Sequence, residues 1–244
     1  MLDLSKAFDS VNHRYLFTKL IELNFPANLI KLLASWYANQ QINIRWKMIV
    51  TDNFHMCNGT RQGSILSPYL FTIYMRDVSN AVVKSGLGCH IGNMPCNILL
   101  YADDIVLISP SWHAQQALLN LCCESTSALF MKFNVAKSAT VIFPPYKGSK
   151  RVTYMFPSFA LDGCPIIVVD NCKYLGHFLS SKDDDDVDIL HQNRLLYART
   201  NLLIRKFGRC SKEVKLCLFK AYCMNFYGES LWECYSTTVL KLTV

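Results

Sequence analysis

The stretch that decides the fold runs from residue 97 to residue 109 and reads NILLYADDIVLIS. Two short apolar runs, Asn97–Ala102 and Ile105–Ser109, are separated only by Asp103 and Asp104. Strand-forming residues on both sides of a polar pair predict a tight β-hairpin with the two aspartates in its turn. Adjacent carboxylates between apolar strands repel each other and resist burial, and bound cations would relieve both penalties. The alternative is a solvent-exposed turn in which aspartate is simply a good turn former.

A further carboxylate stands at the N-terminus, where Asp3 lies in a short apolar strand predicted from Leu2 to Leu4. If this strand lies beside the hairpin in one sheet, three acids meet at one edge. Carboxylate oxygens suit Mg²⁺, and two such ions roughly 4 Å apart activate an attacking hydroxyl and stabilise a leaving pyrophosphate. The pattern indicates nucleotidyl-transfer chemistry, and the alternative for Asp3 is a turn residue that approaches a helix.

The remaining pattern is that of an α+β protein in which helices and strands alternate up to about Ser181 and only helices follow. Helices are predicted after a cap at Ser10 or Asn12, from Leu29 to Tyr37, and over Ser64–Val83, Ser111–Lys132, Val187–Phe207 and Ser211–Phe226. Strands are predicted at Ala139–Phe143 and Tyr174–Leu179, a hairpin turn at Asp162–Gly163, and a half-buried strand where Ile42, Ile44 and Trp46 alternate with polar residues. We therefore expect a lobe boundary near Ser181.

The composition favours a globular protein with a polyanionic partner. The 244 residues are 51% hydrophobic and 18% charged, and 25 Lys and Arg against 18 Asp and Glu give a net charge of +7. This excess supports a nucleic-acid partner without proving one. No apolar stretch reaches the roughly 20 residues of a membrane helix, so we expect no membrane partner. Eleven cysteines, an odd number without a secretory signal, predict reduced thiols in an intracellular protein, either nuclear or cytoplasmic.

Two other polar segments have a predicted role. The loop Gly59–Ser64 carries a guanidinium and an amide toward a helix N-terminus, where backbone N–H groups can hold phosphate; an ordinary turn is the alternative. The four aspartates Asp183–Asp186 directly precede a helix, where acids favour the N-terminal dipole. We interpret that run as a solvated helix start that faces water and not as a metal site.

Together these segments resemble the ordered motifs of reverse transcriptases from non-LTR retrotransposons and, more distantly, group II intron proteins. Motif A is similar to LDLSKAFDSV at residues 2–11, motif B to GTRQGS at 59–64 followed by LSP at 66–68, and motif C to YADD at 101–104. Asn134 and Lys137 resemble motif D, Lys173–Gly176 resembles the motif E hairpin, and Tyr227, Gly228 and Trp232 resemble the thumb-side segment. The resemblance covers nearly the whole chain.

The resemblance implies a right-hand polymerase palm, an antiparallel sheet backed by helices, over residues 1–181 and the helical start of a thumb over residues 182–244. Because the sequence begins within motif A, we expect the fingers that precede it in the family to be missing. The implied activity is that of an RNA-directed DNA polymerase, in which a primer 3′-hydroxyl attacks the α-phosphate of a deoxynucleoside triphosphate under two Mg²⁺ ions, or Mn²⁺ in their place. The implied partners are an RNA template, a DNA primer, deoxynucleoside triphosphates, and the missing fingers or other parts of a longer retrotransposon polyprotein.

Carried over by residue, the resemblance implies that the metal ligands are Asp3, Asp103, Asp104 and the Leu4 carbonyl. Phe8 would be the steric gate that excludes a ribose 2′-hydroxyl, whereas core packing is the alternative for this ring. The incoming nucleotide and template would contact Arg61, Gln62 and Gly63. Lys137 would donate charge or a proton near the leaving phosphates, with a solvated lysine as the alternative.

Nucleic-acid contacts are implied for Lys173, Tyr174 and Gly176 and for the basic helix that follows, with Arg194, Arg199, Arg205 and Lys206 against phosphates. The alternative for these basic residues is a solvated helix face. Two functions stay open: an RNA-directed DNA polymerase, favoured by the intact acids, and a catalytically inactive truncated remnant that binds nucleic acid, favoured by the missing fingers.

Overall fold

The computed structural model describes residues 1–147, 150–151, 157–224, 228–236 and 239. The chain divides into two compact units: unit 1 comprises Met1–Ala139 and Phe156–Ile167, and unit 2 comprises Thr140–Met155 and Val168–Val244. Phe226, the predicted end of the last helix, and Tyr227 lie outside the described residues. The division into palm and thumb at residue 181 stays a prediction.

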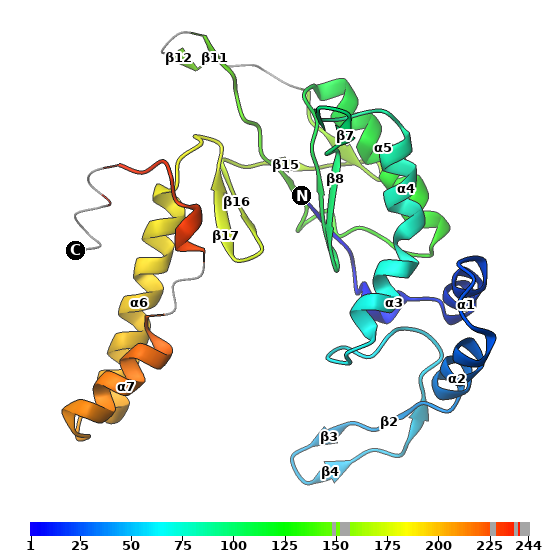
Figure 1. Ribbon diagram of the computed structural model, residues 1–244, viewed down its shortest axis with the longest axis horizontal. Coiled ribbons are helices and arrows are strands. Elements are labelled where there is room, and N and C mark those ends of the chain that lie inside the picture. The colour runs from blue at the N-terminus through cyan, green and yellow to red at the C-terminus, as the bar shows by residue number, and fades with distance from the viewer. Residues whose placement is uncertain (148–149, 152–156, 225–227, 237–238, 240–244) are drawn as a thin grey trace. The chain divides into compact units, whose positions relative to one another are not determined.

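A three-stranded antiparallel sheet carries the predicted hairpin of unit 1 (Figure 1). It is ordered β1 (Leu2–Asp3), β9 (Asp104–Leu107), β8 (Ile98–Tyr101). The register sets Tyr101 opposite Asp104, so the turn consists of Ala102 and Asp103 and the predicted turn at Asp103–Asp104 is one residue late. Ala102 has a φ of 53°, and the short hairpin turn requires this left-handed conformation at its first position although alanine rarely adopts it.

Two helices back this sheet. The helices α4 (Arg76–Lys84) and α5 (Trp112–Ala128) pack on each other, α4 against β8 and α5 against β9 (Figure 1). The predicted start of this helix is confirmed, and the Ser111 side chain caps it by accepting a hydrogen bond of 3.3 Å from the Ala114 amide. However, α5 ends at Ala128 and not at Lys132, because Phe130 has a φ of 60° that no helix contains. The chain from Leu129 to Ser138, here called the strap, therefore leaves the helix and runs beside β1.

The other helices of unit 1 agree with those predicted from the sequence, with one correction. They are η1 (Phe8–Ser10), α1 (His13–Glu22), α2 (Ala27–Ala38) and α3 (Ser67–Tyr74). Asn12 caps α1 by accepting a hydrogen bond of 3.1 Å from the Tyr15 amide, as predicted. The single helix predicted over Ser64–Val83 is wrong: it consists of α3 and α4, which meet at Met75. The start moves to Ser67 because Pro68 favours the first helical position and the Ser67 hydroxyl donates back to the Arg61 carbonyl at 2.5 Å.

A two-stranded arm follows α2 and corrects another prediction. Its ladders pair β2 (Gln41–Ile42) with β5 (Phe54–His55) and β3 (Arg45–Trp46) with β4 (Ile49–Val50). Ile42 is half-buried as predicted, but Ile44 is 57% exposed and Trp46 is 73% exposed. Two further hairpins of unit 1 are β6 (His90–Ile91) with β7 (Met94–Pro95) and β13 (Ala160–Leu161) with β14 (Cys164–Pro165), and the predicted Asp162–Gly163 turn joins the latter.

Unit 2 contains a hairpin and a helical pair. The strand predicted over Tyr174–Leu179 is instead a hairpin of β16 (Asn171–Tyr174) and β17 (His177–Ser180), because Leu175 and Gly176 both have positive φ, 47° and 93°, and reverse the chain. The helices α6 (Asp186–Phe207) and α7 (Lys212–Tyr222) pack together, and η2 (Glu229–Leu231) follows. Further short strands are β10 (Ala139–Thr140), β11 (Tyr146–Lys147), β12 (Lys150–Arg151) and β15 (Ile167–Val168), so the strand predicted over Ala139–Phe143 ends at Thr140. None of the helices in the described residues is long and apolar enough to span a bilayer.

Candidate active site

The predicted acids meet at one end of the three-stranded sheet. Asp3 on β1 lies directly opposite Asp104 on β9, and Asp103 precedes Asp104 in the β8–β9 turn. Burial raises the pKa of Asp104, and the negative charges of Asp103 and Asp3 raise it further. The sheet edge therefore concentrates negative charge that the protein itself does not neutralise at Asp104.

The donor chemistry of this edge fits a divalent cation. Carboxylate oxygens are the ligands that Mg²⁺ prefers, and a cation would relieve the repulsion that raises the pKa of Asp104. In the described part of the chain, no three His, Cys, Asp or Glu side chains converge closely enough to form a ready metal-ligating group. The carboxylates of Asp3, Asp103 and Asp104 would have to turn toward one another to share an ion.

The strap holds Asp3 from the other side of β1. The Asn134 amide donates to the Asp3 carbonyl at 2.8 Å, and the Asp3 amide donates to the Ser138 hydroxyl at 3.2 Å. The Lys137 Nζ lies 4.0 Å from Asp3 Oδ2, with the lysine side chain 70% exposed. An exposed pair at this distance adds little stability, so Lys137 is near Asp3 without being fixed on it.

A cavity of about 410 Å³ opens beside the acidic turn. It is lined by Phe8, Gln62, Gly63, Ser64, Ile65, Ser67, Pro68 and Asp103. Four of the predicted site residues, Phe8, Gln62, Gly63 and Asp103, thus share one cavity although they come from three separate motifs. Arg61 is exposed and does not line this cavity.

Backbone contacts dock the glycine loop onto motif A. The Thr60 amide donates to the Phe8 carbonyl at 2.7 Å, and the Phe8 ring lies 4.8 Å from the Phe71 ring, centroid to centroid. Gly59 has a φ of 90°, and a Cβ at this position would come within 2.9 Å of the Asp9 backbone. Only glycine permits this approach, a role that the sequence pattern did not reveal.

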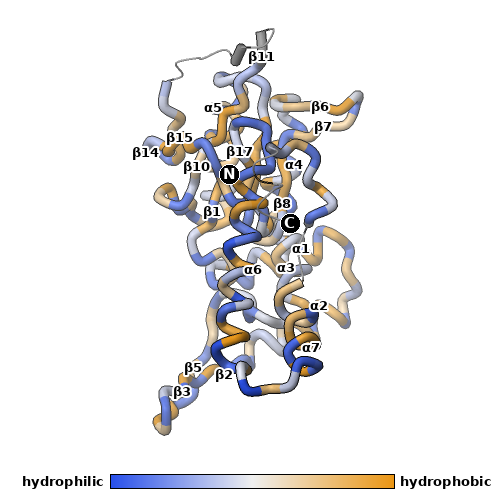
Figure 2. Tube along the Cα trace, turned by 90° about the vertical axis from the view of Figure 1, so that its left-hand side faces the viewer, coloured by the Kyte–Doolittle hydropathy of each residue, from blue (hydrophilic) through white to orange (hydrophobic). Residues whose placement is uncertain are grey.

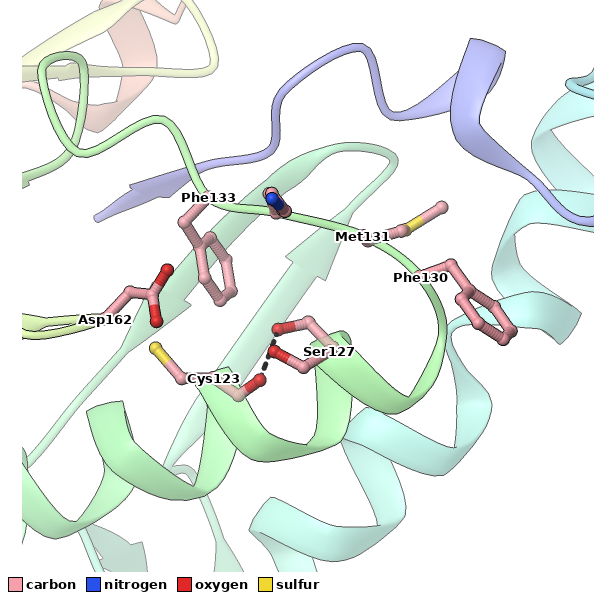
Figure 3. A pocket seen from close by; sticks show the side chains of 8 residues that line it. Cys123, Ser127, Phe130, Met131, Phe133 and Asp162 are labelled. Atoms are coloured by element: carbon pink, nitrogen blue, oxygen red, sulfur yellow. Dashed lines mark hydrogen bonds between the residues drawn. The ribbon is translucent and has the colours of Figure 1, made fainter.

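A second cavity of about 400 Å³ lies between the strap, the last turns of α5 and the β13–β14 turn (Figure 3). Its lining includes Cys123, Phe133 and Asp162, and none of the predicted site residues belongs to it. Burial raises the pKa of the Cys123 thiol, so this side chain stays protonated and is a weak nucleophile and ligand. Sequence reasoning missed this cavity because the helix was predicted to continue to Lys132, so the strap that forms one of its walls was not expected.

The predicted nucleic-acid contacts of unit 2 lie on two elements. Lys173 and Tyr174 end β16 and Gly176 is in the turn that follows, whereas Arg194 and Arg199 are exposed on α6. The helical pair of α6 and α7, with the turn between them, contains eight Lys or Arg against Asp186, Asp188 and Glu213, so its net charge is +5. Hydrophilic and hydrophobic residues alternate along α6 (Figure 2), and most of the net positive charge of the protein resides on this helical pair.

The aspartate run corrects the prediction of a water-facing helix start. Asp185 Oδ2 accepts hydrogen bonds of 2.8 Å from the Glu233 and Cys234 amides, and Asp186 Oδ1 accepts one of 2.7 Å from the Ser236 amide. These carboxylates hold the C-terminal segment of unit 2 against the start of α6. The pairing joins residues about fifty positions apart, which helix-start rules do not address.

Comparison with known proteins agrees with the motifs. Residues 1–179 match the family described as reverse transcriptase (RNA-dependent DNA polymerase). The Pol polyprotein of the type-2 retrotransposable element R2DM from Drosophila melanogaster is 29% identical over 178 residues, which are 72% of this chain and 17% of that protein. A Pol polyprotein of the type-1 element R2 from Popillia japonica is 27% identical over 185 residues, covering 74% of this chain and 30% of that protein.

A third relative extends the similarity into the C-terminal helices. The RNA-directed DNA polymerase of the mobile element jockey from Drosophila funebris is 24% identical over 243 residues, covering 93% of this chain and 25% of that protein. The chain therefore spans less than a third of the length of these relatives. Since the family match reaches across most of the chain and includes every residue placed at the sheet edge and its cavity, the chain belongs to the reverse transcriptase (RNA-dependent DNA polymerase) family, in its non-LTR retrotransposon branch.

Proposed function

We propose that this chain is the palm and the start of the thumb of an RNA-directed DNA polymerase, which copies an RNA template by adding deoxynucleotides to a DNA primer. One observation carries the proposal: the acidic sheet edge and the Phe8–Gln62 cavity share Asp103. A carboxylate that borders a cavity of nucleotide size is suited to join metal binding to substrate binding. The name of the jockey relative, an RNA-directed DNA polymerase, supports the same activity.

The metal ligands in this proposal are Asp3 and Asp103, with Asp104 and the Leu4 carbonyl completing the set. When bound, two Mg²⁺ or Mn²⁺ ions supply the charge that activates a primer hydroxyl and stabilises the leaving pyrophosphate. The protein contributes the placement. The strands β1 and β9 hold Asp3 and Asp104 opposite each other, and the strap forms hydrogen bonds with both the N–H and the carbonyl of Asp3.

The nucleotide would enter the cavity between Phe8 and the glycine loop. Phe8 is braced by Phe71 and by its carbonyl contact with Thr60, so its ring can act as a rigid wall against a ribose 2′-hydroxyl. Gln62 and Gly63 line the cavity and can contact the nucleotide, while Arg61 would reach the phosphates from outside it. Lys137, exposed near Asp3, is suited to give a proton to the leaving pyrophosphate.

Nucleic-acid contacts would come from unit 2. Lys173, Tyr174 and Gly176 on the β16–β17 hairpin and Arg194 and Arg199 on α6 are the proposed residues, and the net charge of +5 on the helical pair supports phosphate binding. The RNA template, DNA primer and deoxynucleoside triphosphates are the proposed partners, together with the fingers and other parts of a longer polyprotein such as those of the relatives. An intracellular location, nuclear or cytoplasmic, belongs to the same proposal.

Primer extension tests the activity. A labelled DNA primer on an RNA template is incubated with deoxynucleoside triphosphates and Mg²⁺ or Mn²⁺, and the chain is compared with Asp103→Ala and with Asp183→Ala. Asp183 is exposed and lies in unit 2, so its substitution is a matched control for the loss of one aspartate. Incorporation that disappears only in Asp103→Ala supports the polymerase. Binding of the primer–template without any aspartate-dependent incorporation would instead make this chain the catalytically inactive nucleic-acid-binding remnant.

A further inference from the structure

A buried carboxylate of unit 2 has no part in the proposed chemistry. Asp188 lies in the first turn of α6 and is 2% exposed. Its Oδ1 accepts a hydrogen bond of 3.0 Å from the Phe178 amide, and its Oδ2 accepts bonds of 2.9 Å from the Trp232 indole and 3.0 Å from the His177 imidazole Nδ1. One side chain therefore links a strand, a helix and the C-terminal segment.

The bond to Phe178 follows from the register of the β16–β17 hairpin. Tyr174 lies opposite His177 next to the two-residue turn, and Lys173 lies opposite Phe178. In such a hairpin the pair beside the turn exchanges hydrogen bonds and the next pair does not, so the Phe178 N–H points away from β16. Asp188 satisfies this outward amide and fixes β17 on α6 at the position opposite Lys173.

The donors around Asp188 keep it ionised. Burial alone would raise its pKa, but hydrogen bonds from Trp232, Phe178 and His177 more than offset burial and hold the pKa below its ordinary value. An ionised acceptor makes stronger and more directional hydrogen bonds than a neutral one. The network is thus a charge-assisted anchor and not an incidental contact.

Packing around the network is close on two sides. The His191 ring of α6 lies 4.8 Å from the Phe178 ring, centroid to centroid. At Gly228, which has a φ of 78°, an added Cβ would come within 2.0 Å of the His177 ring. The backbone at Gly228 therefore packs directly against the His177 ring, and His177 begins the strand that directly follows the turn at Gly176.

We propose that Asp188 is a positioning residue for nucleic-acid binding: through His177 and Phe178 it fixes the β16–β17 hairpin on α6, so that Lys173 and Tyr174 meet the nucleic acid together with Arg194 and Arg199. This inference rests on the proposed function, because it assigns a role to Asp188 within that binding. Asp188 itself touches no nucleic acid in this arrangement. It couples two binding elements whose contacts would otherwise move independently.

The test compares Asp188→Asn with Asp183→Asn, which removes the same charge from an exposed position five residues earlier. Binding of a fluorescent RNA–DNA primer–template is measured well below the melting temperature, and amide hydrogen exchange of the hairpin is measured in the free protein. Loss of a negative charge alone tightens binding to a polyanion in both variants. We expect Asp188→Asn to weaken binding by about 10-fold, as lost charge-assisted hydrogen bonds would, and to speed exchange at Phe178. Asp183→Asn should do neither.

Each outcome decides between the two proposals. Equal affinity of Asp188→Asn and Asp183→Asn, or unchanged exchange at Phe178, overturns the positioning role while wild-type binding leaves the proposed function intact. Absence of primer–template binding by the wild-type chain overturns the proposed function and with it the role of Asp188 in nucleic-acid binding. If Asp188→Asn does not fold, Trp232→Phe is the second variant, because it removes one of the three donors and keeps an aromatic ring. A measurable loss of affinity that is smaller than about 10-fold then supports the inference, and an unchanged affinity overturns it.

Discussion

Asp104 in unit 1 and Asp188 in unit 2 are carboxylates in opposite circumstances. Burial and the charges of Asp103 and Asp3 raise the pKa of Asp104, whereas the pKa of Asp188, which burial would also raise, is held low by its three donors. Asp104 begins a strand of one β-hairpin and Asp188 contacts a strand of another, and both are partly or fully removed from water. The protein supplies hydrogen-bond donors to one carboxylate and further negative charge to the other.

The difference separates a carboxylate that needs a ligand from one that completes the fold. Like charges placed opposite each other on paired strands destabilise a sheet, so we expect the Asp3–Asp104 pair to reduce stability, and the proposed cation would relieve this repulsion. Asp188 needs no ligand, because its partners are supplied from within unit 2. A crowded acidic edge that the fold leaves uncompensated is therefore better evidence of a metal-dependent site than any single aspartate.

The largest expected effect separates the two carboxylates by activity. Asp3→Asn removes a proposed metal ligand, so we expect primer extension to fall by a factor on the order of 1,000 or more. Asp188→Asn should keep incorporation within about tenfold of the wild type at saturating primer–template, because it weakens binding and not the chemical step. Single-turnover extension measures both variants. Comparable losses in the two would erase the distinction drawn between these residues.

The next effect separates them by stability. Asp188→Ala removes the acceptor that the half-buried His177, Phe178 and Trp232 donors share, and each lost hydrogen bond to a charged group costs about 1.5–3 kcal/mol. Since these half-buried donors can bond to water once the carboxylate is gone, we expect a total loss of about 2–4 kcal/mol in the free energy of unfolding. Urea unfolding monitored by circular dichroism measures the loss. A change below about 0.5 kcal/mol would contradict a structural role for this carboxylate.

Acidification should change the stability contributed by Asp188 and the stability contributed by Asp104 in opposite directions. The depressed pKa of Asp188 means that its stabilising contribution is present above the unfolded value of about 3.9 and is lost as the pH falls through the lower folded pKa. The raised pKa of Asp104 means that the folded protein loses stability as the pH rises through the folded pKa, from about 4 upward. Melting temperatures of Asp188→Asn and Asp104→Asn between pH 3 and pH 7 measure this. The deficit of Asp188→Asn should shrink toward pH 3, and a deficit that stays constant would count against the assigned pKa shift.

The acidic edge could be predicted from the sequence because local rules fix each of its parts. Strand-forming residues on both sides of the aspartates identify the hairpin, and the conditional expectation that β1 lies beside it is confirmed by the Asp3–Asp104 register. The cap at Asn12 and the Asp162–Gly163 turn were predicted for the same reason. The turn itself was misplaced by one residue, since turn propensity favours aspartate over Ala102.

The Asp188 network could not be predicted because its partners are remote in the chain. Trp232 lies 44 residues from Asp188, and no periodic pattern relates an indole donor to a carboxylate at that separation. For a related reason, the prediction that the arm is half-buried was wrong at Ile44 and Trp46. The alternation of Ile42, Ile44 and Trp46 indicates a strand with two faces, but it does not show whether another element covers one of them. Sequence patterns thus predicted the acidic sheet edge and missed the contacts that tertiary packing creates.

The smallest expected effect tests the central claim about the acidic edge. Asp104→Asn keeps the size of the side chain and removes one member of the cross-strand like-charge pair, so we expect the free energy of unfolding at pH 7 to rise by roughly 0.2–1 kcal/mol. Thermal melting in a metal-free buffer measures this gain. Mg²⁺ should raise the melting temperature of the wild type, since a ligand that binds only the folded state stabilises it, and should raise that of Asp104→Asn less. Asp162→Asn, in another hairpin turn of unit 1, is the control and should show neither response. If Asp104→Asn is less stable than the wild type without metal, Asp104 contributes to the fold as Asp188 does, and the uncompensated charge at this sheet edge loses its meaning as a sign of metal binding.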